Sequence, residues 1–214
     1  MARRNDHSPE ELRRLAVEAA RAIAAEEGLR GLTVRRVAER IGYAPGTLYN
    51  LFSNLDELVL RVNAETLDRM AEALEAAAES PLPQRAAALV YAYFDTIAAE
   101  PLIWGMLFEH RLPPGQELPD WYNERLERLV GIAGAGLGPL MADWPETERR
   151  QAIVAMWAGL HGISTLTVSA KLSLVDRTDP RALGRLLVER VIAAGPPRPV
   201  PQEACAAAPV DAES

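Results

Sequence analysis

The stretch LTVRRVAERIGYAPGTLYNLF, residues 32–52, decides the fold. Thr33 supplies a hydroxyl cap for a first short helix, and Gly42 ends that helix without Cβ strain. Pro45 fixes φ at the start of a second short helix, which is polar and runs to the end of the stretch. The first helix carries apolar residues at the i, i+3, i+4, i+7 spacing of a helix with one buried face, namely Val34, Val37, Ala38 and Ile41.

Two short helices joined by a tight glycine-containing turn predict a helix-turn-helix. In that motif the first helix packs against the core, and the second enters the major groove of DNA. Leu48 and Phe52, four residues apart, form the inward face of the second helix. The pattern alone leaves one alternative open, an ordinary helical hairpin.

Helical signals continue on both sides of this stretch. Ser8-Pro9-Glu10-Glu11 is a capping box with proline at the first helical position, and the helix that it starts is expected to end at Gly28. Asp143 and Glu146 have the spacing of a second capping box. No period-2 alternation bounded by turns is present. The sequence therefore predicts an all-α fold of about nine helices, over residues 9–28, 33–41, 45–52, 54–80, 82–99, 101–111, 120–137, 143–172 and 180–195.

The chain is expected to have three parts. Residues 1–53 form a helix-turn-helix DNA-binding domain, residues 54–195 form a helical regulatory and dimerisation domain, and the Pro- and Ala-rich residues 196–214 form a disordered tail. For Arg3 and Arg4 two interpretations stay open with equal weight, an arm that reaches the DNA backbone and a solvated terminus.

The net charge of −7 and the pI of about 5.1 argue against a protein that coats nucleic acid non-specifically or lies on an anionic membrane. The charge is unevenly divided, since residues 1–53 carry a net +2 and residues 54–214 a net −9. A single cysteine, Cys205, excludes an internal disulfide framework and a Cys-rich metal site, and fits a reducing compartment. Residues 1–30 have no apolar core of a secretory signal, so a cytoplasmic location is expected.

The stretch from Gln151 to Ala170 carries no charge and has the length of a membrane span. It also contains a histidine, a glutamine, two glycines and four hydroxyl residues, which favour a helix buried on all sides within a soluble protein. A helix without a solvent face needs cover, and a two-fold partner would complete it. The sequence therefore predicts a homodimer and no membrane partner.

The ordered string over residues 32–52 resembles the N-terminal domain of the TetR family of bacterial transcriptional regulators, and the resemblance extends over roughly residues 8–60. In that family, residues at the start of the second helix and on the third contact operator DNA. The resemblance implies phosphate anchoring by Thr33, Thr47 and Tyr49, and a base or phosphate contact by Arg35. The full set of DNA contacts that it implies is Thr33, Arg35, Ala44, Pro45, Gly46, Thr47 and Tyr49.

Three positions depart from the family pattern. Leu51 stands where an aromatic residue or histidine is frequent, Leu55 stands where a lysine is usual, and Ala44 replaces the usual serine cap. Loss of a phosphate contact flattens the salt dependence of DNA binding by roughly one unit of slope. Loss of the cap costs on the order of 1 kcal/mol at the helix start. The departures bear on DNA affinity and hardly on the fold.

The string Trp157-Ala158-Gly159-Leu160-His161-Gly162 resembles the Trp-His-Gly signature in the regulatory domain of one TetR subfamily. This resemblance implies a dimer interface built as a four-helix bundle from the last two helices of each chain. Small residues along the uncharged helix and apolar residues along the last helix are the candidates for this interface: Ala155, Gly159, Gly162, Leu183, Leu187 and Val191.

Large side chains of the middle helices are the candidates for an effector pocket, because such pockets are mostly apolar with a few fixed polar groups. Aromatic residues at helical spacing are also typical of a core, and a histidine on an apolar face is typical of a hydrogen-bonded core residue. Both alternatives stay open for the candidate ligand-binding residues Tyr91, Phe94, Trp104, Phe108, Trp157 and His161.

The sequence predicts a ligand-responsive repressor that binds a palindromic operator as a homodimer and is released by a hydrophobic small molecule. Two other functions are the alternatives to this prediction. A ligand-independent dimeric DNA-binding regulator would lack an internal cavity. A helical enzyme is disfavoured, because the sequence has no Gly-rich phosphate loop, no Gly-x-Ser-x-Gly elbow and no His/Cys cluster with metal-ligand spacing. No catalytic residue, metal or cofactor is expected.

Overall fold

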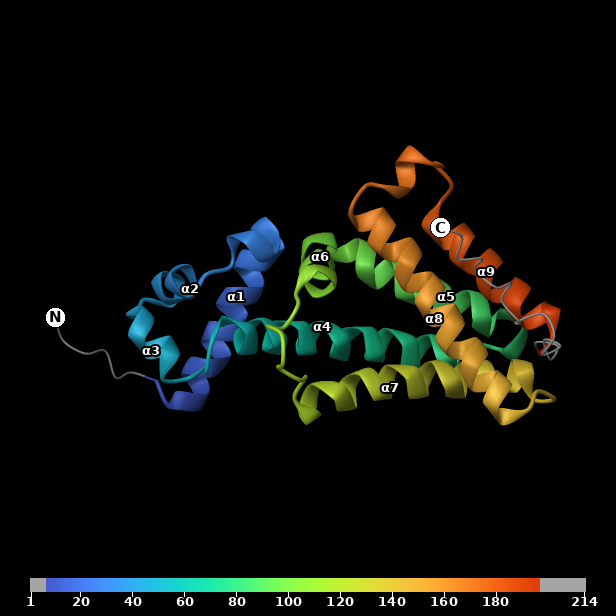
Figure 1. Cartoon of the computed structure of the whole chain (residues 1–214), viewed down its shortest axis with the longest axis horizontal. Helices are drawn as coiled ribbons and strands as arrows, with labels where there is room; N and C mark the ends of the chain where they lie inside the picture. The colour runs from blue at the N-terminus through green and yellow to red at the C-terminus, as the bar shows by residue number, and fades with distance from the viewer. Residues whose placement is uncertain (1–6, 197–214) are drawn as a thin grey trace, which may run out of the picture.

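The computed structural model of the chain describes residues 7–196, and over this range it is built from α-helices and two short 3-10 turns without strands (Figure 1). The arm with Arg3 and Arg4 and all of the predicted tail except Pro196 lie outside the described residues. The α-helices are α1 (Pro9–Gly31), α2 (Val34–Ile41), α3 (Pro45–Tyr49), α4 (Leu55–Ala78), α5 (Leu82–Ala99), α6 (Pro101–Glu109), α7 (Asp120–Leu137), α8 (Glu146–Val168) and α9 (Pro180–Ala194).

Local capping fixes the starts of several helices, as the sequence predicts. The Ser8 Oγ accepts a hydrogen bond from the Glu11 amide, and the Glu11 carboxylate accepts one from the Ser8 amide at 2.7 Å. The Thr33 hydroxyl accepts from the Arg36 amide at 3.3 Å. The Asn54 side chain accepts from the Glu57 amide at 2.9 Å at the start of α4. These bonds satisfy amide groups that a helix start leaves without a partner.

Three predicted helix ends are wrong. Gly28, with φ +67°, kinks α1 instead of ending it, and the helix continues to Gly31. The third helix ends at Tyr49 rather than near Phe52. The uncharged helix ends at Val168, because Ala170 adopts a left-handed φ of +57° and the Lys171 amide bonds back to the Leu166 carbonyl at 2.8 Å.

One predicted helix start is also wrong. α8 begins at Glu146 directly after Pro145, and no side chain caps it, so the expected capping box from Asp143 is not formed. Pro145 fixes the extended backbone that precedes the first turn, which provides the start without a side-chain cap.

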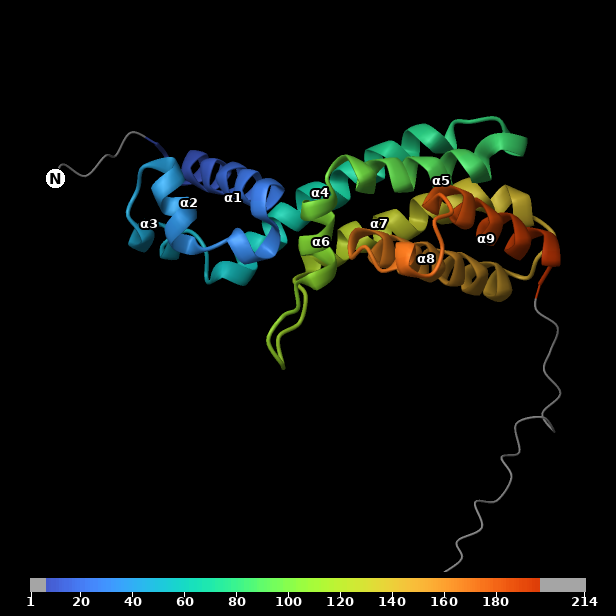
Figure 2. The same cartoon turned by 90° about the horizontal axis from the view of Figure 1, so that it is seen from above.

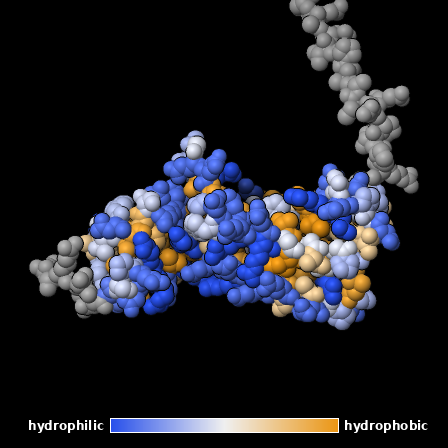
Figure 3. Space-filling view, turned by 90° about the horizontal axis from the view of Figure 1, so that it is seen from below, coloured by the Kyte–Doolittle hydropathy of each residue, from blue (hydrophilic) through white to orange (hydrophobic). Residues whose placement is uncertain are grey.

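The molecule is elongated. α1, α2 and α3 form one end, α5, α7, α8 and α9 form the other, and α4 runs from the first group along the second (Figures 1 and 2). α6 lies between the two groups, and the chain bends by 96° between α5 and α6. On the face shown in Figure 3, apolar side chains form patches over the end that holds α1, α2 and α3 and also over the opposite end of the molecule.

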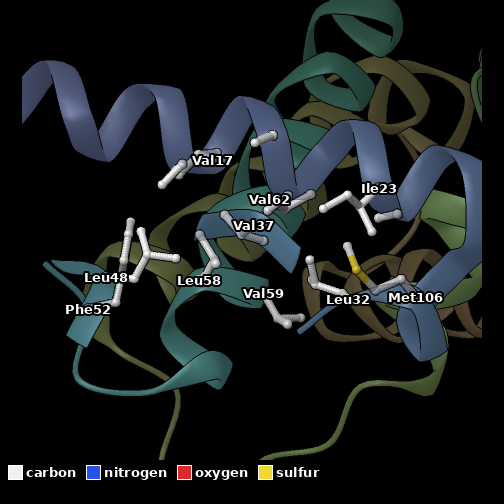
Figure 4. Packing of buried hydrophobic residues seen from close by; sticks show 14 of the residues in the cluster. Val17, Ile23, Leu32, Val37, Leu48, Phe52, Leu58, Val59, Val62 and Met106 are labelled. Carbon is white, nitrogen blue, oxygen red and sulfur yellow. The ribbon is translucent and has the colours of Figure 1, made fainter. Parts of the chain in front are cut away.

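The first core is formed by α1, α2, α3 and the start of α4, and it also contains two residues of α6 (Figure 4). Ile103 and Met106 of α6 are fully buried in it, and Met106 lies beside Leu32 and Ile23. Leu58, Val59 and Val62 of α4 belong to the same core. A domain boundary at residue 53 stays a prediction, although the packing of the first core continues into α4.

The second core joins α4 and α5 with α7, α8 and α9. Two glycines set how closely its helices approach. A Cβ on Gly184 of α9 would lie 2.3 Å from the Phe94 ring of α5, and a Cβ on Gly159 of α8 would lie 2.4 Å from Leu187 of α9. A side chain at either position would have to displace a neighbouring side chain, so the two glycines let α9 pack closely on α5 and α8.

The single chain does not cover α8 on all sides, and whether a two-fold partner completes the cover stays a prediction. Only 22% of its most apolar 18-residue window is buried, although the helix is long and apolar enough to span a bilayer by length and composition. Val154, Trp157 and Leu166 are exposed on α8, and Leu186 is exposed on α9.

Two neighbouring residues of α6 test the role of this helix in the first core. Ile103 is 0% exposed, whereas Leu102 beside it is 44% exposed. We expect Ile103→Ala to lower the free energy of unfolding by about 2–5 kcal/mol, because it leaves a cavity in a packed core. Leu102→Ala is the matched control, with an expected change within about 0.5 kcal/mol. Urea denaturation followed by circular dichroism measures both, and equal losses would contradict the assignment of α6 to this core.

Candidate nucleic-acid interface and regulatory cavities

The helix-turn-helix formed by α2 and α3 is held from beneath by buried side chains. Val37 and Ala38 anchor α2, and Leu48 with the following Phe52 anchors α3. Gly42, with φ +77°, makes the turn between them. None of the residues that the family resemblance singles out for DNA contact is buried: Thr33, Arg35, Ala44, Pro45, Gly46 and Tyr49 are exposed, and Thr47 is half-buried.

Arg35 is paired but remains accessible. Its Nε donates to the Glu39 carboxylate at 2.8 Å, and the two side chains are 80% and 58% exposed. Exposed ion pairs of this kind contribute about 0–1 kcal/mol, so a phosphate or a base edge can replace Glu39 at little cost. The Thr33 hydroxyl, which accepts from the Arg36 amide, still has its own proton to donate.

Two of the departures from the family pattern have a packing role. Leu51 and Leu55 are half-buried and lie against the first core. The Leu51 carbonyl also accepts a hydrogen bond from Arg13 of α1 at 3.2 Å. Leucine at these positions therefore contributes apolar contact between α1, α3 and α4, where a lysine or histidine would offer a charge or a donor to DNA.

A network of charged side chains joins α1 to the corner between α5 and α6. The guanidinium of Arg21 on α1 binds the Glu100 carboxylate and donates to the Thr66 hydroxyl at 3.1 Å. Arg69 of α4 binds the same carboxylate at 3.1 Å. The side chains of Arg21 and Glu100 are only 11% and 34% exposed, so this pair is less screened than the surface pairs. A polar groove of about 670 Å³ runs beside the network, and there burial raises the pKa of Glu65.

The other end of α6 is tied to α4. The Nε2 of His110, which follows α6, lies 2.8 Å from the Asp56 carboxylate in the first turn of α4. His110 is therefore a structural partner of Asp56. Among residues 7–196, no group of three or more His, Cys, Asp or Glu side chains is arranged to hold a metal ion.

Four of the predicted effector residues contact one another in a row between α6 and α8. The ring centroids of Trp104 and Phe108 are 5.9 Å apart, those of Phe108 and His161 are 4.6 Å apart, and those of His161 and Trp157 are 5.4 Å apart. The Trp104 Nε1 donates to the Thr96 carbonyl at 3.1 Å. Burial lowers the pKa of His161. Trp104, at one end of this row, is buried in the second core, whereas Trp157, at the other end, is exposed.

Two cavities among the described residues are lined in part by α8. The first, here called the central cavity, is small at about 50 Å³ and almost wholly apolar. It is lined by residues of α4, α5, α7, α8 and α9: Leu74, Ala86, Leu89, Val90, Tyr93, Ala133, Leu137, Ile153, Met156, Trp157, Leu160 and Val188.

The second, here called the corner cavity, has a volume of about 330 Å³ and lies where the end of α5 meets the start of α6. It is lined by Phe94, Ile97, Ala98, Pro101, Ser164, Thr167, Val168, Asp179, Pro180 and Arg181.

The six predicted effector residues thus do not meet in one place. Phe94 lines the corner cavity and Trp157 lines the central cavity, while Tyr91 is exposed on α5 with its hydroxyl 3.4 Å from Arg185 of α9. Their assignment to a ligand site stays a prediction. Sequence reasoning missed Ser164 and the Arg21–Glu100 pair, since a serine in an uncharged helix and an arginine in a charged helix carry no distinguishing local signal.

The predicted interface residues divide between two environments. Ala155 and Gly162 are exposed on α8, and no atom lies within 4 Å of the position of a Cβ on Gly162. Gly159 instead contacts Leu187 within the same chain. Leu183, Leu187 and Val191 of α9 are half-buried against α5 and α8.

Two family models match the chain. Residues 16–62 match the model described as bacterial regulatory proteins, tetR family. Residues 86–191 match the model described as tetracyclin repressor-like, C-terminal domain. The first match contains all seven predicted DNA contacts, and the second contains both cavities apart from Leu74. A search of the curated proteins found no match.

Solved structures share the fold at low sequence identity. A protein of unknown function from Rhodococcus sp. RHA1 has a TM-score of 0.71 and 19% identity, with 92% of this chain and 100% of that chain covered. A TetR transcriptional regulator from the same organism has a TM-score of 0.63 and 20% identity, covering 86% and 97%. The transcriptional regulator FadR from Bacillus subtilis, in complex with stearoyl-CoA, has a TM-score of 0.63 and 19% identity, covering 84% and 97%.

The two family matches together cover most of the chain. The match to the DNA-binding domain comes first in the sequence and the match to the C-terminal domain follows it, and both matched segments are helical in the structure. They identify the protein as a DNA-binding transcriptional regulator and not as an enzyme. The chain belongs to the TetR family of bacterial transcriptional regulators.

Proposed function

We propose that this regulator is a repressor that binds a palindromic operator as a homodimer in the cytoplasm and leaves it when a hydrophobic small molecule enters the regulatory helices. The observation that carries the proposal is the packing of α6. Ile103 and Met106 of α6 belong to the core of the DNA-binding helices, whereas Trp104 belongs to the core of the regulatory helices. A displacement of α6 caused by a ligand therefore reaches both cores.

The uncovered face of α8 supports the homodimer. Val154, Trp157 and Leu166 expose apolar surface there, and Ala155 and Gly162 leave room for a close approach by another helix. Leu186 continues the apolar surface onto α9. A two-fold pairing of α8 and α9 from two chains would bury these residues in one four-helix interface.

A dimer also suits the DNA-reading element. One small helix-turn-helix makes few base contacts, whereas two related by a two-fold axis read two half-sites one helical turn apart, or a multiple of it. The net charge of −9 on residues 54–214 opposes binding of the regulatory domain to DNA. Affinity then depends on the spacing of the two reading elements, which an effector can change.

The effector must prefer the conformation that does not fit the operator, because a ligand with equal affinity for both conformations shifts nothing. α4 starts in the first core and runs along the second, so a change in the regulatory helices can also tilt the helix-turn-helix through α4. The alternative of a ligand-independent regulator has less support, since the corner cavity, at about 330 Å³, has the volume of a small-molecule site, about 300–1,000 Å³.

Selection of bound fragments from genomic DNA, repeated with a panel of hydrophobic small molecules, tests the proposal as a whole. We expect a palindromic sequence to be enriched, and at least one compound to abolish the enrichment. Enrichment of single, unpaired half-sites would contradict the homodimer. Enrichment that no compound changes would favour the ligand-independent regulator.

Replacement of Arg35 tests the DNA-reading surface. We expect Arg35→Ala to weaken operator binding and to reduce the slope of log K against log salt by about one unit per protomer, because one phosphate contact is lost in each half-site. Arg128→Ala on α7, which removes a surface arginine paired with Glu75 and Asp68 and lying outside the helix-turn-helix, is the control. Fluorescence anisotropy at several salt concentrations measures the slope. An unchanged slope with lost operator preference would assign Arg35 to a base edge, and unchanged affinity would remove it from the interface.

Two exposed helical glycines test the dimer surface. Gly162 on α8 and Gly131 on α7 both have open space beyond the Cβ position. We expect Gly162→Glu to convert dimers to monomers in sedimentation velocity, because it places a charge in the proposed interface. Gly131→Glu, the same change away from that interface, should leave the dimer intact. A dimeric Gly162→Glu variant would contradict a pairing through this face of α8.

A further inference from the structure

The segment that holds the DNA-reading helix carries no positive charge. Residues 41–60 run from the end of α2 through α3 into the start of α4, and they contain no arginine, lysine or histidine, whereas Asp56 and Glu57 are acidic. Contacts to phosphates supply the non-specific affinity of a protein for DNA and a large part of its specific affinity, and arginine and lysine are the side chains that neutralise them. A cation for the phosphates beside α3 therefore has to come from another part of the chain.

The start of α1 contacts the chain on both sides of α3. Before α3, the Nδ1 of His7 lies 2.9 Å from the Tyr43 hydroxyl, and the two ring centroids are 6.1 Å apart. After α3, the Nε of Arg13 donates a hydrogen bond to the Leu51 carbonyl at 3.2 Å. From there α1 runs away from α3 toward α6 (Figure 1). Side chains at the start of α1 thus belong to the surroundings of the reading helix.

The Arg13 guanidinium is held in place through one N–H group and is otherwise open. The side chain is exposed, and the bond to the Leu51 carbonyl uses only its Nε, so the N–H groups of both Nη atoms stay available. Among residues 7–196, Arg13 has no carboxylate partner, whereas four other arginines of α1 and α2 are each paired with a glutamate: Arg14, Arg35, Arg36 and Arg40. A guanidinium oriented in this way is suited to a phosphate, which arginine binds through two parallel N–H groups.

The junction between α3 and α4 lacks the cation that the family resemblance implies there. Leu55, at the position where a lysine is usual, is half-buried against the first core and offers no charge. The hydrogen bond to the Leu51 carbonyl places the Arg13 guanidinium at this same junction. A helix that precedes the helix-turn-helix in the chain therefore brings a positive charge to the point where the helix-turn-helix has none.

We infer that Arg13 is a DNA-contact residue of this regulator, which binds a backbone phosphate beside the end of α3 and replaces the charge that Leu55 does not provide. The DNA-binding surface then includes the start of α1 as well as α2 and α3. None of the seven residues that the sequence singles out for DNA contact belongs to α1. The inference rests on DNA binding, and it requires neither the homodimer nor the effector of the proposed function.

Two arginines of the same helix provide a matched test. Like Arg13, Arg30 is exposed and has no ion-pair partner among the described residues, but it lies at the other end of α1. We expect Arg13→Gln to reduce the slope of log K against log salt by about one unit per bound protomer, because one phosphate contact is lost, and Arg30→Gln to keep the wild-type slope. Fluorescence anisotropy of the full chain on the selected palindromic operator, at several salt concentrations, measures both slopes.

The salt slope separates a contact with DNA from a supporting role in the fold. If Arg13 only holds the Leu51 carbonyl, Arg13→Gln lowers the melting temperature or the affinity but keeps the wild-type slope, because the number of released counterions is unchanged. That result, or equal slopes for Arg13→Gln and Arg30→Gln, would overturn the inference. If genomic selection yields no palindrome, the proposed repressor fails, while the same titrations on a mixed-sequence duplex still decide the role of Arg13.

A rescue experiment tests whether Arg13 stands in for the missing lysine. We expect Leu55→Lys, added to Arg13→Gln, to restore the wild-type slope, because it returns a charge to the junction of α3 and α4. Leu102→Lys on α6, which adds the same charge at an exposed position outside the helix-turn-helix, is the control and should restore nothing. A double variant that keeps the slope of Arg13→Gln, or a full extra unit of slope from Leu55→Lys alone, would show that the two positions do not serve the same phosphate.

Discussion

The insertion of α6 into the core of the DNA-binding helices is the contact on which the rest of the structure depends. Ile103 and Met106 fill space between α1 and the start of α4, and Trp104, one residue from Ile103, is buried in the other core. Because protein cores are close-packed, α6 cannot shift without repacking both sides. The Glu100 network and the His110–Asp56 contact hold the two ends of this nine-residue helix. The DNA-binding and regulatory helices are thus joined by packing as well as by the continuous chain of α4.

Much of the fold could be predicted from the sequence, because the signals that define it are local. The spacing of Val34, Val37, Ala38 and Ile41, the Thr33 cap and the turn at Gly42 depend only on near neighbours along the chain, and all appear in the structure. The errors arose where the backbone departs from the usual residue preferences. Gly28 kinks a helix instead of ending it, and Ala170 takes the left-handed conformation that normally indicates glycine.

The functional residues were less predictable than the fold, because the walls of the cavities depend on which faces of the helices pack together. Six of the seven residues singled out for DNA contact are exposed and Thr47 is half-buried, and their role in DNA binding stays a prediction. The effector candidates were chosen by size and aromatic character, and these properties do not distinguish a pocket wall from a packed core. Ser164 has neither property, and only tertiary packing buries it beside Tyr93. Arg21 likewise gains its role from Glu100, 79 residues away in the chain.

The two glycines that bring α9 against its neighbours have a consequence for motion. The position of a Cβ on Gly184 lies less than 2.5 Å from Phe94, and that of a Cβ on Gly159 lies less than 2.5 Å from Leu187, so α9 meets α5 and α8 closely at these two points. A movement of α9 at these points would push on α5 and α8. Because α5 leads directly into α6, such a movement would be passed on to the helix whose side chains belong to both cores.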